Sequence, residues 1–226
     1  MTVKKRRRGE RGKGRKAGDD RVTSNQILGA AIDLFAVRGF MSTSLQAIAD
    51  KLGVSQSAVM YYFPNKTKLF EGCISLIQTR NKAVVETQVA AEDDALIRLR
   101  KHFHSNLKWA TDSPEEAQII LLLYSLAAFD PGFAALNIQV LQVAREKIRA
   151  FLLAGQREQL FHLKIDIAVC AETLHDSLLA GILTWLTTRK HLKDNKAHLK
   201  RLKAKWDELI ASVTGVGAVL KKVPRG

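Results

Sequence analysis

A short segment of the chain, QSAVMYYF at residues 56–63, carries polar side chains that a folded core does not need. Read as a helix, it turns Val59 and Phe63 inward and leaves Gln56, Ser57 and Tyr61 without a packing role. A glutamine amide can form two hydrogen bonds with the edge of adenine, and small or flexible apolar side chains suit the methyl group of thymine. The residue types of this segment therefore favour contact with a nucleic acid.

Residue types that carry catalysis are present, but they are not in catalytic arrangements. His175, Asp176 and Ser177 are consecutive, and adjacent side chains on a helix diverge, so they cannot form a nucleophilic relay. His102 and His104 face different sides, and no histidine or cysteine spacing matches a zinc site. The glycines near residue 215 lack a third glycine and a preceding strand, so no nucleotide-binding motif is present. We expect no enzyme, no metal and no other cofactor.

Basic charge lies at the two ends of a chain whose formal net charge is +14. Residues 1–21 contain ten Lys or Arg against three acidic residues, and residues 189–226 contain eleven against three. These ends favour an anionic partner. Nucleic acid is favoured over a membrane because the N-terminal run lacks the apolar face of an interfacial helix. Plain solvated surface charge is the alternative, above all for the C-terminal cluster.

The chain has the composition of a soluble cytoplasmic protein. Its longest apolar run, at residues 119–129, is shorter than the roughly 20 residues that span a bilayer. The basic N-terminus is not followed by the apolar segment of a signal peptide. Cys73 and Cys170 are far apart in apolar surroundings, unlike the disulfide framework of a secreted protein.

Three short helices are predicted between residues 23 and 63. A capping-box pattern at Thr23 starts the first, a second T-x-x-Q pattern at Thr43 starts the next, and Ser55 caps the third. The last two are joined by a Gly-Val turn. This is the layout of a helix-turn-helix, in which one helix enters the major groove while its neighbour braces on the backbone.

The rest of the chain is also predicted to be helical, because no strand-like alternation appears anywhere. A long helix runs from Asn65 toward Val85, and further helices are expected at 94–111, 114–129, 133–155, 164–188 and 195–213. The predicted fold class is all-α.

The segment ADKLGVSQSAVMYYFPNKTKLFEG, residues 49–72, resembles the tetracycline-repressor (TetR) family. AIDLFAVRGF and the T-S-L-x-x-I-A start of the second helix extend the resemblance over residues 24–72, and beyond residue 72 it is architectural. The resemblance implies a dimeric transcription regulator, most often a repressor released by a small-molecule effector. Ser57 and Met60 depart from the Gly and Tyr that family members often carry, so the operator sequence cannot be copied from a relative.

The resemblance also implies a domain plan and a mechanism. The predicted segments are a disordered basic arm at 1–21, a helix-turn-helix domain at 22–68, a helical ligand-binding and dimerisation domain at 69–215 and a basic tail at 216–226. A ligand in the larger domain would move the linker helix, at about 65–89, and so change the separation of the two recognition helices in the dimer.

By the same resemblance, one group of residues contacts bases and another contacts phosphates. The expected base contacts are Gln56, Ser57, Ala58 and Met60, with Gln46 joining from the preceding helix. The expected phosphate contacts are Thr43, Ser44, Ser55, Tyr61, Tyr62 and Lys66. Hydroxyls and a lysine are suitable groups for phosphate. The alternative is that Thr43 and Ser55 only cap helices and that Tyr62 only packs on Leu34 and Phe35.

Two apolar stripes near the C-terminus are candidates for a dimer interface. The stripes are Leu174, Leu178, Ile182 and Trp185, and then Leu199, Leu202, Trp206, Leu209 and Val213. The second has coiled-coil-like spacing. The last two long helices of TetR-like proteins form a four-helix dimer interface, and we expect these stripes to do so. The alternative is that both stripes pack inward within one chain.

An apolar effector cavity is expected among the remaining helices. Its candidate wall residues are Phe103, Leu107, Trp109, Tyr124, Phe129, Phe133, Leu141, Cys170 and His175. Such residues at helical spacing also fit a plain core.

The expected partners are double-stranded, palindromic operator DNA, a second copy of the chain and an unidentified small-molecule effector, with no membrane partner. The basic ends make a sequence-tolerant, nucleoid-like DNA-binding protein the alternative. A protein-interaction adaptor with a vestigial helix-turn-helix is a further alternative, against which the intact motif at residues 55–66 argues.

Overall fold

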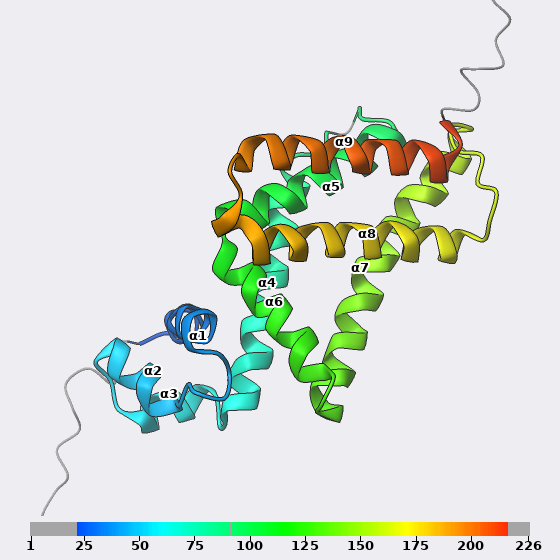
Figure 1. The fold of residues 1–226 in the computed structure, drawn as a ribbon. Helices are drawn as coiled ribbons and strands as arrows, with labels where there is room; N and C mark the ends of the chain where they lie inside the picture. Colours follow the sequence, from blue (N-terminus) through cyan, green and yellow to red (C-terminus); the bar gives the residue numbers. More distant parts are fainter. Residues whose placement is uncertain (1–21, 91, 217–226) are drawn as a thin grey trace, which may run out of the picture.

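The computed structural model of the protein describes residues 22–90 and 92–216 (Figure 1). Over these residues the chain forms nine α-helices and one short 3-10 helix, without a strand. The all-α class expected from the sequence is confirmed. The predicted basic arm at 1–21 and all but the first residue of the predicted basic tail at 216–226 lie outside the described residues.

The N-terminal domain contains three helices, α1 (Ser24–Arg38), α2 (Leu45–Leu52) and α3 (Gln56–Tyr62). The predicted capping box at Thr23 is present. Gly53 ends α2 in the left-handed conformation, with φ at 68°, which a residue with a side chain rarely adopts. Val59 is fully buried and holds α3 against its neighbours.

The larger domain contains α4 (Lys66–Glu86), α5 (Ala95–Asp112), α6 (Pro114–Ala127), α7 (Pro131–Arg157), α8 (Ile167–Thr188), the 3-10 helix η1 (Arg189–His191) and α9 (Asn195–Thr214). Most of these helices begin at a side chain that accepts a backbone N–H, the usual N-cap bond. The capping residues are Asn65, Asp94, Asp130, Asp166 and Asp194. In Figure 1, α4 leads from the N-terminal domain into the larger domain, and α8 and α9 lie side by side at its far end.

The two apolar stripes expected at a dimer interface instead face the core of a single chain. Leu174, Leu178, Ile182, Trp185, Leu202 and Trp206 are all buried, and Leu199, Leu209 and Val213 pack half-buried against them. The Trp206 side chain is 0% exposed, and its indole N–H donates to the Ser177 carbonyl oxygen at 3.2 Å. Gly181 permits this close approach, because a Cβ there would lie 2.5 Å from the indole ring. The six buried side chains therefore pack inward, as in the alternative.

Helix α8 is long and apolar enough to cross a membrane by length and composition alone. Its buried stripe packs against α7 and α9.

An aromatic cluster joins the two domains. Phe133, at the start of α7, meets Phe40 and Phe70 edge to face, with ring centroids 5.2 and 5.5 Å apart. Phe40 and Phe70 also contact Phe35 of α1. Helix α1 packs along α6 as well. The N-terminal domain therefore shares a core with the larger domain.

Candidate nucleic-acid interface and ligand cavity

Helix α3 presents the polar face that its sequence predicted. Gln56, Ser57 and Met60 are exposed, and the Tyr61 side chain is 84% exposed. Ala58 is half-buried and packs partly against the core. The start of the helix is held by Ser55, whose hydroxyl accepts the Ala58 backbone N–H at 3.2 Å. The Ser57 hydroxyl shares a hydrogen bond with the Ser55 hydroxyl at 2.9 Å, and Gln56, Met60 and Tyr61 extend from the helix toward the space where the edges of bases in a groove would lie.

The predicted phosphate contact at Thr43 needs correction. Thr43 is 1% exposed, and its hydroxyl donates to the Gly39 carbonyl at 2.8 Å, so its side chain cannot reach DNA. The N-cap of α2 is Ser44, which is exposed and accepts the Ala47 backbone N–H. Thr43 was predicted as the cap from the T-x-x-Q pattern, but the helix begins one residue later.

Lys66 is engaged with the protein itself. Its ammonium group donates to the carbonyl oxygens of Phe40 and Met41, at 2.8 and 3.3 Å, and lies 4.5 Å from the centre of the Phe40 ring. Burial lowers the pKa of this lysine. Lys66 therefore secures the loop between α1 and α2, and the structure does not present it as a free phosphate contact.

The other predicted contacts, Tyr61, Tyr62 and Gln46, differ in the bonds that their side chains already form within the protein. The Tyr61 ring is exposed and meets Tyr62 edge to face, whereas the Tyr62 hydroxyl donates to the Val22 carbonyl at 3.1 Å. Gln46 is exposed on α2, and its amide donates to the Asp50 carboxylate at 2.6 Å. Tyr62 therefore secures the start of α1 in addition to any contact with DNA.

The larger domain contains a cavity of about 1410 Å³ between α4, α5, α6, α7 and α8. Of the predicted wall residues, Trp109, Tyr124, Leu141 and His175 line it. The prediction is wrong for the others. Phe103, Leu107 and Cys170 are buried core residues, Phe133 lies in the interdomain cluster, and Phe129 is 90% exposed.

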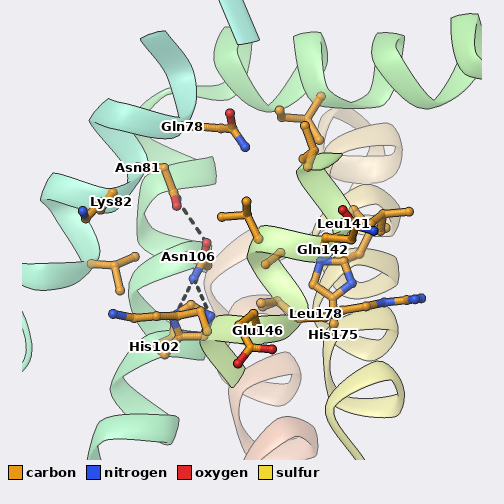
Figure 2. Close-up of a pocket in the computed structure, with 18 of the residues that line it drawn as sticks. Gln78, Asn81, Lys82, His102, Asn106, Leu141, Gln142, Glu146, His175 and Leu178 are labelled. Carbon is orange, nitrogen blue, oxygen red and sulfur yellow. Dashed lines mark hydrogen bonds between the residues drawn. The ribbon is translucent and has the colours of Figure 1, made fainter. Parts of the chain in front are cut away.

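Sequence reasoning missed the main polar wall of this cavity. Asn81 of α4 donates to the Asn106 side-chain oxygen at 3.1 Å, and Asn106 donates to the His102 backbone carbonyl at 2.8 Å. Figure 2 shows these three residues on one side of the cavity and His175 with Leu178 on the other. The i, i+4 spacing of His102 and Asn106 was the available signal, but only the fold brings Asn81 to them.

A buried carboxylate next to the cavity was also missed. Glu116 of α6 is buried and accepts hydrogen bonds from Trp109 of α5 at 2.9 Å and from Arg80 of α4 at 2.7 Å. Trp109 lines the cavity, and Arg80 lies on the helix that follows the N-terminal domain. Three helices are therefore tied together at one acidic side chain.

A short, well-capped helix-turn-helix joined to a larger helical domain is the arrangement of a DNA-binding transcription regulator. Residues 27–73 match the family model of bacterial regulatory proteins, tetR family. The chain is similar to the probable acrEF/envCD operon repressor of Escherichia coli K12, at 24% identity over 73% of this chain and 76% of the relative. It is also similar to the HTH-type transcriptional regulator RutR of the same organism, at 30% identity over 42% of this chain and 45% of the relative.

One solved structure of similar fold matches most of this chain and nearly all of its own length. It is a TetR-family transcriptional regulator from Rhodococcus sp., with a TM-score of 0.74 and 18% identity over 84% of this chain and 98% of that chain. Residues 27–73 therefore resemble the tetR family of bacterial regulatory proteins, and the fold is similar to that of a TetR-family regulator. Members of this family bind operator DNA as dimers and respond to small-molecule ligands. The similarity to these regulators also supports the expectation that the chain is not an enzyme.

Proposed function

We propose that this protein is a cytoplasmic, homodimeric repressor that binds a palindromic operator and is released by a small molecule in its cavity. The observation that carries the proposal is the exposed face of α3, where Gln56, Ser57, Met60 and Tyr61 stand outside a buried Val59. The chain is similar over most of its length to the probable acrEF/envCD operon repressor, and this similarity supports repression over activation.

The dimer interface is assigned to the outer faces of α8 and α9, because their inner faces are used within one chain. Helix α8 carries exposed Glu172 and Asp176, which also pair with Arg145 of the same chain, and the outer face of α9 carries exposed Lys200, Arg201 and Lys205. A two-fold axis that sets α8 of one chain on α9 of its partner brings opposite charges together twice. These helices lie far from α3 in Figure 1, so the interface leaves α3 free to bind DNA.

A ligand in the cavity can release the protein from its operator because α4 joins the cavity to the DNA-binding domain. This helix begins directly after α3 and supplies Ile77, Gln78, Asn81 and Val85 to the cavity wall. A ligand that prefers one position of α4 shifts the population of that position. Since each half-site is read by one α3, a change in the separation of the two helices weakens binding to the operator.

The test is selection of genomic DNA fragments by the purified protein, followed by affinity measurements on the fragments recovered. We expect a shared palindromic motif. Gln56→Ala should cost about 1–3 kcal/mol of operator binding and leave binding to random DNA almost unchanged. Gln156→Ala, an exposed glutamine at the end of α7, is the matched control and should change neither. Recovery of unrelated fragments with equal affinity would instead favour the sequence-tolerant DNA-binding protein.

A further inference from the structure

The side chains that line the cavity between α4, α5, α6, α7 and α8 indicate the charge and polarity of its ligand. We propose that the cavity takes an uncharged molecule, with an apolar body and one or more hydrogen-bonding groups, in preference to a carboxylate or an ammonium compound. This inference rests on the proposed function, in which the same cavity binds the effector.

Most of the wall is apolar. Side chains from all five helices form it, among them Ile77, Trp109, Ile120, Leu178 and Ile182. Ile77 and Ile182 are also buried in the core, so these walls are fixed by packing. An apolar body that fills such a space leaves water and gains the hydrophobic contribution of its buried area.

The polar groups of the inner wall are neutral. Asn81 and Asn106 are amides that hydrogen-bond to each other. His102 is only 9% exposed, its Nδ1 has no hydrogen-bond partner within the described part of the chain, and burial lowers the pKa of its imidazole to about 4. The Tyr124 hydroxyl forms no hydrogen bond with the described residues, and burial raises its pKa to about 12. These groups can bond a hydroxyl, an amide or a carbonyl, but they offer no charge.

His175 on the opposite wall is also a neutral group. Its side chain is buried, and burial lowers its pKa further than the neighbouring Asp176 raises it. Together with His102 it places an imidazole on each of two facing walls (Figure 2).

The charged residues of the lining are more exposed and are mostly paired with each other. Arg145 pairs with Glu172 at 3.1 Å and with Asp176 at 3.3 Å. Arg149 pairs with Glu146 at 3.3 Å, and Lys82 pairs with Glu86 at 3.8 Å. A carboxylate or ammonium on the ligand would have to break one of these pairs or remain buried without a counter-charge.

Lys147 has no carboxylate partner among the described residues, and it is the group that would attract an anion. Its side chain is exposed, and its ammonium lies 5.4 Å from the centre of the Phe151 ring. An attraction at this exposed position is weak and is screened by salt. It therefore does not decide the class of ligand inside the cavity.

Three probes of matched shape test the proposal by calorimetry on the full chain at pH 7.5. They are 2-naphthol, which is neutral, 2-naphthoate, which is an anion, and 2-(aminomethyl)naphthalene, which is a cation. We expect 2-naphthol to bind at least about tenfold more tightly than either ion in both 0.15 M and 0.5 M salt. Equal or tighter binding of either ion would overturn the proposal, as would the absence of binding by all three.

Cavity variants show where the probe binds. Leu141→Trp adds a large ring to the cavity wall, and Gln139→Trp adds the same ring to an exposed position on α7 outside the lining. Only the first should abolish binding of 2-naphthol, and Gln78→Trp on α4 serves as a second cavity variant if Leu141→Trp does not fold. Binding that survives in both cavity variants would overturn the assignment. If 2-naphthol binds as expected but does not weaken DNA binding, the ligand class stands and the proposed effector function does not.

Discussion

Trp109 and Arg80 donate hydrogen bonds to the two oxygens of one buried carboxylate, that of Glu116. The indole nitrogen lies 2.9 Å from Oε2, and the guanidinium nitrogen lies 2.7 Å from Oε1. Trp109 lines the cavity, whereas Arg80 belongs to α4, which leads to the DNA-binding domain. Any movement of the cavity wall at Trp109 therefore acts on a group that also holds α4.

Replacing this carboxylate should destabilise the fold more than replacing an exposed one. In Glu116→Gln the charge is lost while Trp109 and Arg80 remain, so we expect a loss of about 1–3 kcal/mol of unfolding free energy. Asp112→Asn is the matched control, because it removes an exposed pair with Lys108 on α5 and should cost no more than about 0.5 kcal/mol. Urea titrations of the three proteins measure both effects, and similar losses in the two variants would show that Glu116 has no special role.

The interdomain aromatic cluster should contribute strongly to stability. Phe133→Ala removes a buried ring that contacts Phe40 and Phe70, and we expect a cost of about 3–5 kcal/mol. The control is Phe129→Ala, four residues earlier, where the exposed ring should contribute within about 0.5 kcal/mol. Thermal or denaturant unfolding gives the comparison. A mild effect of Phe133→Ala would mean that the two domains are not held together through this cluster.

Substitutions at two adjacent residues of α9 should have different effects, one on folding and the other on dimerisation. Trp206→Glu places a charge in the core next to Ser177 and Gly181, so the larger domain should lose its fold. Lys205→Glu reverses a charge on the exposed outer face and should weaken the dimer while the helical content is retained. Circular dichroism with light scattering over a range of concentrations distinguishes the outcomes. If Trp206→Glu gave a folded monomer, Trp206 would belong to the dimer interface and not to the core of one chain.

Acid should destabilise the protein through its buried histidines. Burial lowers the pKa of His102 from 6.5 to about 4, with smaller contributions from Lys147 and His175. The unfolded chain therefore binds more protons than the folded chain between these values, so stability is lost as the pH falls from about 6.5 toward 4. His102 alone should account for about 2 kcal/mol between pH 8 and pH 5. His104 and His175 have pKa values lowered mainly by burial and act in the same direction.

The measurement is the unfolding free energy as a function of pH for the protein and for His102→Phe, which keeps a ring beside Phe103 and Phe151. The variant should have a flatter dependence between pH 7 and pH 5. His162→Phe, at an exposed position, should follow the unmodified protein. Parallel curves for the protein and His102→Phe would contradict the assignment of this titration to His102.

Local sequence patterns are enough to predict the class of fold and the position of the recognition helix. Helix starts and ends are local features: a serine, threonine, asparagine or aspartate accepts the first free N–H groups, and a glycine adopts the left-handed end. The caps at Thr23 and Ser55 and the turn at Gly53 are predicted on these grounds, and the exposed face of α3 follows from the spacing of Val59 and Phe63.

Tertiary structure alone decided which side of each helix is used and which distant residues meet. The stripe through Leu202 and Trp206 has the same spacing whether it packs on a partner or on its own chain, because helical periodicity defines a face but not its occupant. Likewise, Asn81 reaches Asn106, and Arg80 reaches Glu116, only because α4 lies beside α5 and α6. These contacts join residues more than twenty positions apart, and no local rule of capping or periodicity carries that information.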